Sequence, residues 1–195
     1  MSSYKAVIFD MGDVLFSWNP QPTAQISLQT LHLMTQCDRW FDLERGTITP
    51  EDCYRELGRR FSVNGTEIAA AFEQATESLT PNSTMTSLVQ DLKQHNIRVY
   101  MMTNIPRSNY DQLREMEYIW NEFDEIFASG YMGMRKPDQC FYEHVLGVIN
   151  VPPTETIFVD DRMENIVSAI KLGMSGIQCV NVVETCEKIR LMTGI

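Results

Sequence analysis

Hydrophobic and polar positions alternate in blocks along this chain, and the blocks predict a regular succession of strands and helices. Residues 7–9 form a short apolar run that ends at Asp10, as in a strand buried on both faces. Further strands are predicted at 97–103, 125–128, 156–159 and 177–182, and helices at 85–95, 106–116, from 137, 163–172 and 184–192. Repeated strand–helix units predict an α/β fold with a doubly wound parallel sheet.

The segment from residue 17 to residue 80 has a different pattern, with helical spacing and no convincing strand. One helix is expected at 23–34 and another from Thr49-Pro50 to about residue 60, since threonine caps helices and proline suits their first position. Asn64-Gly65 forms a turn before a third helix at 66–79. We therefore expect a helical cap subdomain at 17–80, inserted into an α/β core of residues 1–16 and 81–195.

Composition and charge narrow the class of partner. A net charge of −10 argues against nucleic acid or an acidic membrane surface. The five cysteines are scattered and form no CxxC pair, which is typical of reduced thiols. No apolar run reaches membrane-spanning length, and Asp10 interrupts the one candidate leader segment. We expect a cytoplasmic protein with a small-molecule substrate, and leave a homodimer open.

Polar residues that could bind a ligand or take part in catalysis lie at the carboxyl ends of the predicted strands or just before a predicted helix. In parallel sheets, ligands bind at this edge. Each signal alone is also explained by a turn or a helix cap. The residues are Asp10, Thr103, Asn104, Arg135, Lys136, Asp160 and Asp161.

In their order and separation these stretches resemble the four motifs of the haloacid dehalogenase (HAD) superfamily, with a Rossmann-like core. The resemblance implies that Asp10 is the nucleophile or a metal ligand. It implies catalytic roles for Thr103, Lys136 and Asp161, and phosphate contacts from Thr103, Asn104, Arg135 and Lys136. A Mg²⁺ ion would be held by Asp10, Gly12, Asp160 and Asp161, since Mg²⁺ prefers oxygen ligands and bridges to phosphate.

Gly12 departs from the pattern of the superfamily. Phosphatases that this chain resembles generally carry a second aspartate there, as the general acid that protonates the leaving alcohol. Asp13 follows one residue too late for the same role. Chemistry whose leaving group needs no protonation would suffer less from this change.

One such chemistry is the ionisation of an allylic diphosphate. Asp160, Asp161 and Glu164 form a DDxxE pattern, which is also the metal-binding pattern of class I terpene synthases. The chain is similar to fungal HAD-like proteins that include terpene cyclases. The preferred hypothesis is a Mg²⁺-dependent sesquiterpene synthase acting on farnesyl diphosphate. The alternatives are a phosphatase of a small organic or prenyl phosphate, and a non-catalytic phosphate-binding protein.

Aromatic residues of the cap are candidates for a substrate pocket. Trp18 follows the first motif, and Trp40 and Phe41 precede a charged run. Aromatic faces stabilise cations and exclude water. Such residues also commonly form the core of a small helical subdomain, so both interpretations stay open.

Overall fold

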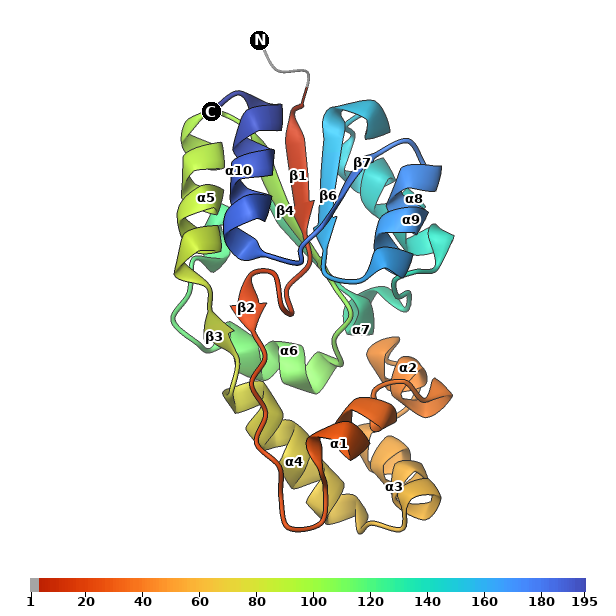
Figure 1. The fold of residues 1–195 in the computed structure, drawn as a ribbon. Helices are drawn as coiled ribbons and strands as arrows, with labels where there is room; N and C mark the ends of the chain where they lie inside the picture. The colour runs from red at the N-terminus through yellow and green to blue at the C-terminus, as the bar shows by residue number, and fades with distance from the viewer. Residues whose placement is uncertain (1–3) are drawn as a thin grey trace.

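The computed structural model describes residues 4–195 and is built around a five-stranded parallel sheet (Figure 1). The strands lie in the order β5-β4-β1-β6-β7, which puts the first strand at the centre. Their bounds are β1 Ala6–Phe9, β4 Arg98–Thr103, β5 Glu125–Ala128, β6 Thr156–Asp160 and β7 Ser175–Gln178. Because every neighbouring pair is parallel, the carboxyl ends of all five strands lie along one edge.

Helices cover both faces of this sheet. They are α5 Ser83–Gln94 and α10 Val182–Thr193 on one face, and α8 Gln139–Ile149 and α9 Met163–Lys171 on the other. Helices α6 Arg107–Arg114 and α7 Ser129–Met132 lie at the carboxyl edge of the sheet (Figure 1), and the short 3₁₀ turns are η1 Trp120–Glu122 and η2 Pro153–Glu155. Successive β1 side chains point to opposite faces: Val7 packs with residues of α5 and α10, and Ile8 packs with residues of α8 and α9. The doubly wound α/β fold expected from the sequence is therefore confirmed.

Four helices form a separate block below the carboxyl edge of the sheet (Figure 1). They are α1 Leu28–Met34, α2 Asp38–Glu44, α3 Pro50–Phe61 and α4 Gly65–Glu77. The chain enters and leaves the block through two short antiparallel strands, β2 Phe16–Ser17 and β3 Thr80–Pro81. The helices enclose their own apolar cluster, which includes Trp40, Leu57 and Phe72. The domain bounds given above stay a prediction, and residues 1–3 of the predicted core lie outside the described residues.

The observed helices and strands differ from the predicted ones mainly in where they begin and end. The last strand ends at Gln178 rather than at residue 182, because Asn181 accepts a hydrogen bond from the backbone of Glu184 and starts α10. The predicted helix at 23–34 begins only at Leu28, with Ser27 as its cap. Helix α2 was not expected, and Cys37 at its start makes no side-chain cap bond.

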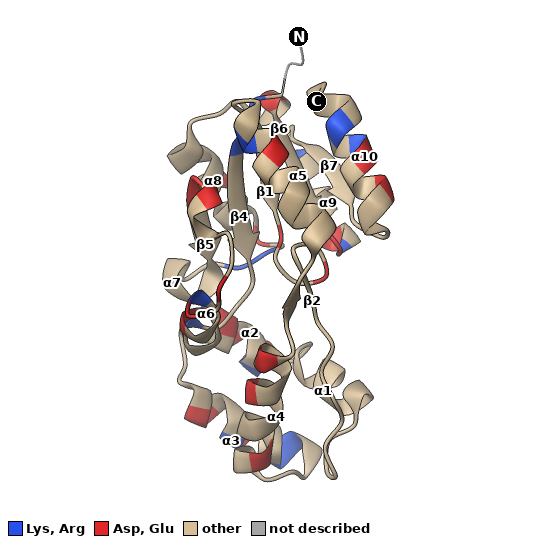
Figure 2. Ribbon diagram, turned by 90° about the vertical axis from the view of Figure 1, so that its left-hand side faces the viewer, with Lys and Arg blue, Asp and Glu red and all other residues tan. Residues whose placement is uncertain are grey.

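Charged residues are present in both parts of the molecule (Figure 2). Acidic residues occur in both the sheet-bearing part and the helical block (Figure 2). Within residues 4–195, no helix is both long enough and apolar enough to cross a bilayer. The five cysteines are free thiols, as the sequence predicted.

Candidate active site

The centre of the site is a lysine held between two aspartates. Lys136 Nζ lies 2.7 Å from Asp10 Oδ1 and 2.7 Å from Asp160 Oδ2. The strand register explains the meeting of the two acids, since Phe9 of β1 pairs with Val159 of β6 and each aspartate comes next. Burial by itself lowers the pKa of Lys136, but attraction by the two carboxylates raises the pKa by more, so the pKa of the lysine is raised.

Asp160 is held in place from several sides. Its side chain is fully buried, and its two oxygens accept hydrogen bonds from Asn165 Nδ2 at 2.9 and 3.0 Å. The backbone N–H of Arg162 donates to Asp160 Oδ1 at 2.9 Å. These contacts fix the orientation of Asp160 relative to Lys136 and to the loop that carries Asp161.

Asp10, Asp160 and Asp161 form a cluster that fits a cation. One carboxylate oxygen from each lies within 4.8 Å of the others. Burial raises the pKa of Asp10 to about 7; Lys136 opposes this shift, and repulsion from Asp160 adds to it. Burial and repulsion from Asp160 raise the pKa of Asp161 to about 6. Hard carboxylate oxygens under mutual repulsion are the environment in which Mg²⁺ binds.

Thr103 and Asn104 extend this centre from the end of β4. Thr103 is buried and lines the same pocket as Asp10. Asn104 lines it too, but its side chain is paired with the backbone of Lys136: Nδ2 donates to the carbonyl, and Oδ1 accepts from the N–H, both at 2.8 Å. The amide of Asn104 therefore fixes the Lys136 loop against β4.

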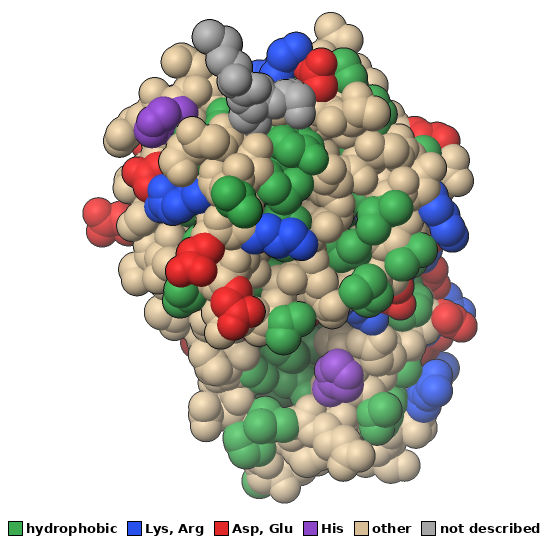
Figure 3. All heavy atoms as spheres, turned by 45° about the horizontal axis from the view of Figure 1, so that its top comes forward, with side chains coloured by type: hydrophobic (Ala, Val, Ile, Leu, Met, Phe, Trp, Pro, Cys, Tyr) green, Lys and Arg blue, Asp and Glu red, His purple; other side chains and the backbone are tan. Residues whose placement is uncertain are grey.

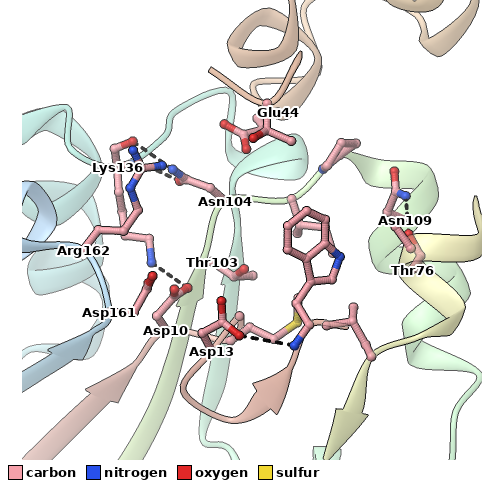
Figure 4. Close-up of a pocket in the computed structure, with 18 of the residues that line it drawn as sticks. Asp10, Asp13, Glu44, Thr76, Thr103, Asn104, Asn109, Lys136, Asp161 and Arg162 are labelled. Atoms are coloured by element: carbon pink, nitrogen blue, oxygen red, sulfur yellow. Dashed lines mark hydrogen bonds and ion pairs between the residues drawn. The ribbon is translucent and has the colours of Figure 1, made fainter. Parts of the chain in front are cut away.

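A pocket opens from this centre toward the helical block (Figure 4). Its polar floor holds Asp10, Thr103, Lys136 and Asp161, and its walls come from both parts of the molecule. The apolar residues that line it include Trp18, Trp40, Phe72, Ala75, Leu79 and Ile105. The surface is hollowed where the two parts meet, and hydrophobic side chains lie there (Figure 3). The pocket thus joins a charged floor to apolar walls.

Two predicted contact residues lie elsewhere. Arg135 is not among the pocket-lining residues; its Nε donates to Glu44 Oε2 at 2.8 Å, and its guanidinium carbon lies 3.9 Å from the ring centroid of Phe41. Phe41 thus covers Arg135 rather than the pocket. The predictions of a phosphate contact for Arg135 and a pocket wall for Phe41 are not supported, because both side chains are used in joining α2 to the core.

Glu164 is likewise separate from the aspartates. Its side chain is 51% exposed on the first turn of α9 and pairs with Arg162 at 2.8 Å. It belongs neither to the acidic cluster nor to the pocket lining. A helix directs successive side chains to different faces, so the DDxxE pattern does not gather its three acids here. The predicted metal contact of Glu164 is therefore not supported.

For several residues that line the pocket, the sequence predicted no functional role. Glu44 lines the pocket, and Trp40 Nε1 donates to its Oε1 at 2.9 Å. Burial raises the pKa of Glu44, partly opposed by Arg135. Asn109 donates to Thr76 Oγ1 at 2.7 Å and so joins α6 to α4 inside the pocket. No local pattern marks these residues, because their partners are distant in the sequence.

The pair of Glu44 and Arg135 gives a prediction about stability. Arg135→Ala leaves a buried carboxylate without its cation, so we expect the free energy of unfolding to fall by about 3 kcal/mol. Urea unfolding followed by circular dichroism measures this. The control is Arg55→Ala, which breaks a half-exposed pair with Asp52 and should leave the free energy of unfolding nearly unchanged. Equal losses in both variants would contradict the structural role of Arg135.

The fold and the site together define the class of protein. A parallel sheet with an aspartate after its first strand, a lysine bridging two aspartates and an acidic cluster is the arrangement of the HAD-like hydrolases. The haloacid dehalogenase-like hydrolase family matches residues 4–173. The chain belongs to this family.

Relatives and solved structures agree with this class. The chain is 49% identical to the sesquiterpene phosphatase astK of Aspergillus oryzae, over 99% of this chain and 98% of that protein. It is 39% identical to the drimenol cyclase drtB of Aspergillus calidoustus, over 89% of this chain but only 33% of the cyclase. A HAD family enzyme from Bacteroides thetaiotaomicron, solved with magnesium and inorganic phosphate, has the same fold, with a TM-score of 0.70 and 22% identity over 90% of this chain and 93% of that one.

Proposed function

We propose that this protein is a Mg²⁺-dependent phosphatase of a prenyl or sesquiterpenoid phosphate. The observation that carries the proposal is the pocket, in which an aspartate–lysine centre lies at the base of apolar walls. The charged floor suits a phosphate, and the walls suit a hydrocarbon group. The similarity to a sesquiterpene phosphatase along nearly the whole chain supports the same substrate class.

Each residue of the site has a distinct role in the proposed reaction. The Asp10 carboxylate attacks phosphorus, and the bond from phosphorus to the substrate oxygen breaks with its electron pair on that oxygen. Water then hydrolyses the aspartyl phosphate to orthophosphate and restores the carboxylate. Lys136 and the Thr103 hydroxyl bind the phosphate oxygens and stabilise the charge of the transition state. Asp10, Asp160 and Asp161, with the Gly12 backbone, would hold Mg²⁺, which neutralises phosphate charge when bound. Asn104 and Asn165 position Lys136 and Asp160.

The same observations weaken the preference for a synthase. Glu164 lies apart from the acidic cluster, so the DDxxE pattern gives no argument for ionising an allylic diphosphate. The cyclase relative is about three times as long as the region that it shares with this chain. The phosphatase, held as the alternative at the outset, is therefore the better-supported function.

One incubation tests the proposal. Purified protein is given farnesyl diphosphate or farnesyl monophosphate with Mg²⁺, and the inorganic and organic products are measured. We expect orthophosphate and an unrearranged farnesyl chain, because Asp10 breaks a phosphorus–oxygen bond. Pyrophosphate with a cyclised C15 product would instead establish the synthase. Chelation with EDTA should lower turnover at least 10²-fold, and full activity after chelation would contradict the metal site.

A further inference from the structure

Arg162 is a pocket residue that the proposed chemistry leaves without a role. Among the described residues that line the pocket, Lys136 and Arg162 carry the positive side chains. Lys136 is only 1% exposed and is engaged by two carboxylates. Arg162 is the other cation of the pocket, and its ion pair with the exposed Glu164 is the contact that a second anionic group would replace.

The surroundings of Arg162 suit such a contact. Its side chain is 38% exposed, and its guanidinium lies 2.8 Å from Glu164 Oε1 and 3.3 Å from Gln36 Oε1 of the helical block. Exposed ion pairs of this kind contribute little, so a substrate anion can replace Glu164 at small cost. The backbone of the same residue is fixed by Asp160. Arg162 lines the same pocket as Lys136 and Asp161, and the three are labelled in the same part of Figure 4.

Gly12 adds a separate observation about the leaving group. No acid stands at this position to protonate an alkoxide, and alkoxides are poor leaving groups. A phosphate monoester is a far better leaving group than an alkoxide, since the second pKa of its phosphate group is about 6. A site without the acid therefore favours cleavage of a phosphoanhydride bond over cleavage of an alkyl phosphate.

We propose that Arg162 binds the inner phosphate of a prenyl diphosphate, and that this site removes the terminal phosphate first. The inference rests on the phosphatase function proposed above. The Asp10 carboxylate attacks the terminal phosphorus, the bond to the bridging oxygen breaks, and the electron pair stays on that oxygen, which becomes part of the prenyl monophosphate. Water then attacks the aspartyl phosphate, giving orthophosphate and restoring the carboxylate. The inner phosphate gains a second negative charge as it leaves, and Arg162 stabilises that charge through its paired N–H donors.

The test compares farnesyl diphosphate with farnesyl monophosphate in wild type, Arg162→Gln and Lys171→Gln. Lys171 lies exposed at the far end of α9, so its variant makes the same change in charge away from the pocket. We expect wild type to prefer the diphosphate in kcat/KM and to accumulate farnesyl monophosphate. Arg162→Gln should reduce that preference about tenfold, the effect of losing one charge-assisted hydrogen bond, and Lys171→Gln should leave it unchanged.

A binding measurement separates recognition from turnover. In the Asp10→Asn background, calorimetry should show that Arg162→Gln weakens a methylene-bridged farnesyl diphosphonate more than farnesyl phosphonate. Equal losses for both ligands, or a wild-type enzyme that hydrolyses the monophosphate at least as fast as the diphosphate, would overturn the proposal while leaving the phosphatase function intact. Release of orthophosphate from neither substrate would overturn both.

Discussion

Asp10→Asn should reduce turnover of any phosphate substrate by about 10⁴-fold or more, the loss expected when a nucleophile is removed. The amide has the shape of the carboxylate but cannot form the aspartyl phosphate. Lys136 keeps its contact with Asp160, so the fold should be retained. Steady-state release of orthophosphate measures the loss. Mass spectrometry after rapid quenching should show one phosphoryl group on wild type and none on the variant.

The matched control is Asp38→Asn, an exposed residue in the first turn of α2 that changes the charge by the same amount. It should keep wild-type activity. Retention of more than a tenth of the activity by Asp10→Asn, or recovery in excess Mg²⁺, would mean that Asp10 is a metal ligand and not the nucleophile.

Gly12→Asp should raise hydrolysis of a prenyl monophosphate about 10²-fold, the lower end of what a positioned general acid contributes. The site has room for the change: a Cβ built on Gly12 meets no atom within 4 Å, and Gly12 is partly exposed in the pocket lining. The new acid would protonate the departing alkoxide, which nothing at this position now does. kcat/KM for the monophosphate and the diphosphate gives the result, and the diphosphate should gain much less.

Gly12→Asn separates acid catalysis from a simple effect of size, because asparagine has the same shape but no acidic proton. It should give no gain. If both variants gained equally, or if a correctly folded Gly12→Asp gained nothing, the missing acid would not control which substrate is hydrolysed.

The strand–helix alternation and the central group of Asp10, Thr103, Lys136 and Asp160 were predictable from the sequence. The apolar runs mark buried strands, and parallel strands bring their carboxyl ends to one edge whatever lies between them in the chain. Asp10, Thr103 and Asp160 stand at strand ends and therefore meet by topology alone, whereas Lys136 lies in the loop before α8 and was assigned through the family resemblance. This is why the motif order was enough to place the chain in its family.

The tertiary structure decided the roles of side chains whose direction and contacts cannot be read from local spacing. Arg135 directly precedes Lys136, yet it pairs with Glu44, 91 residues earlier, and is not among the residues that line the pocket. Glu164 completes a metal-binding pattern by spacing, but the first turn of α9 directs it to the surface. Local spacing fixes which face of an element a residue occupies, whereas its role depends on what packs against that face. For Arg135 the packing partner is the docked helical block, and for Glu164 it is the neighbouring Arg162 at the surface of α9.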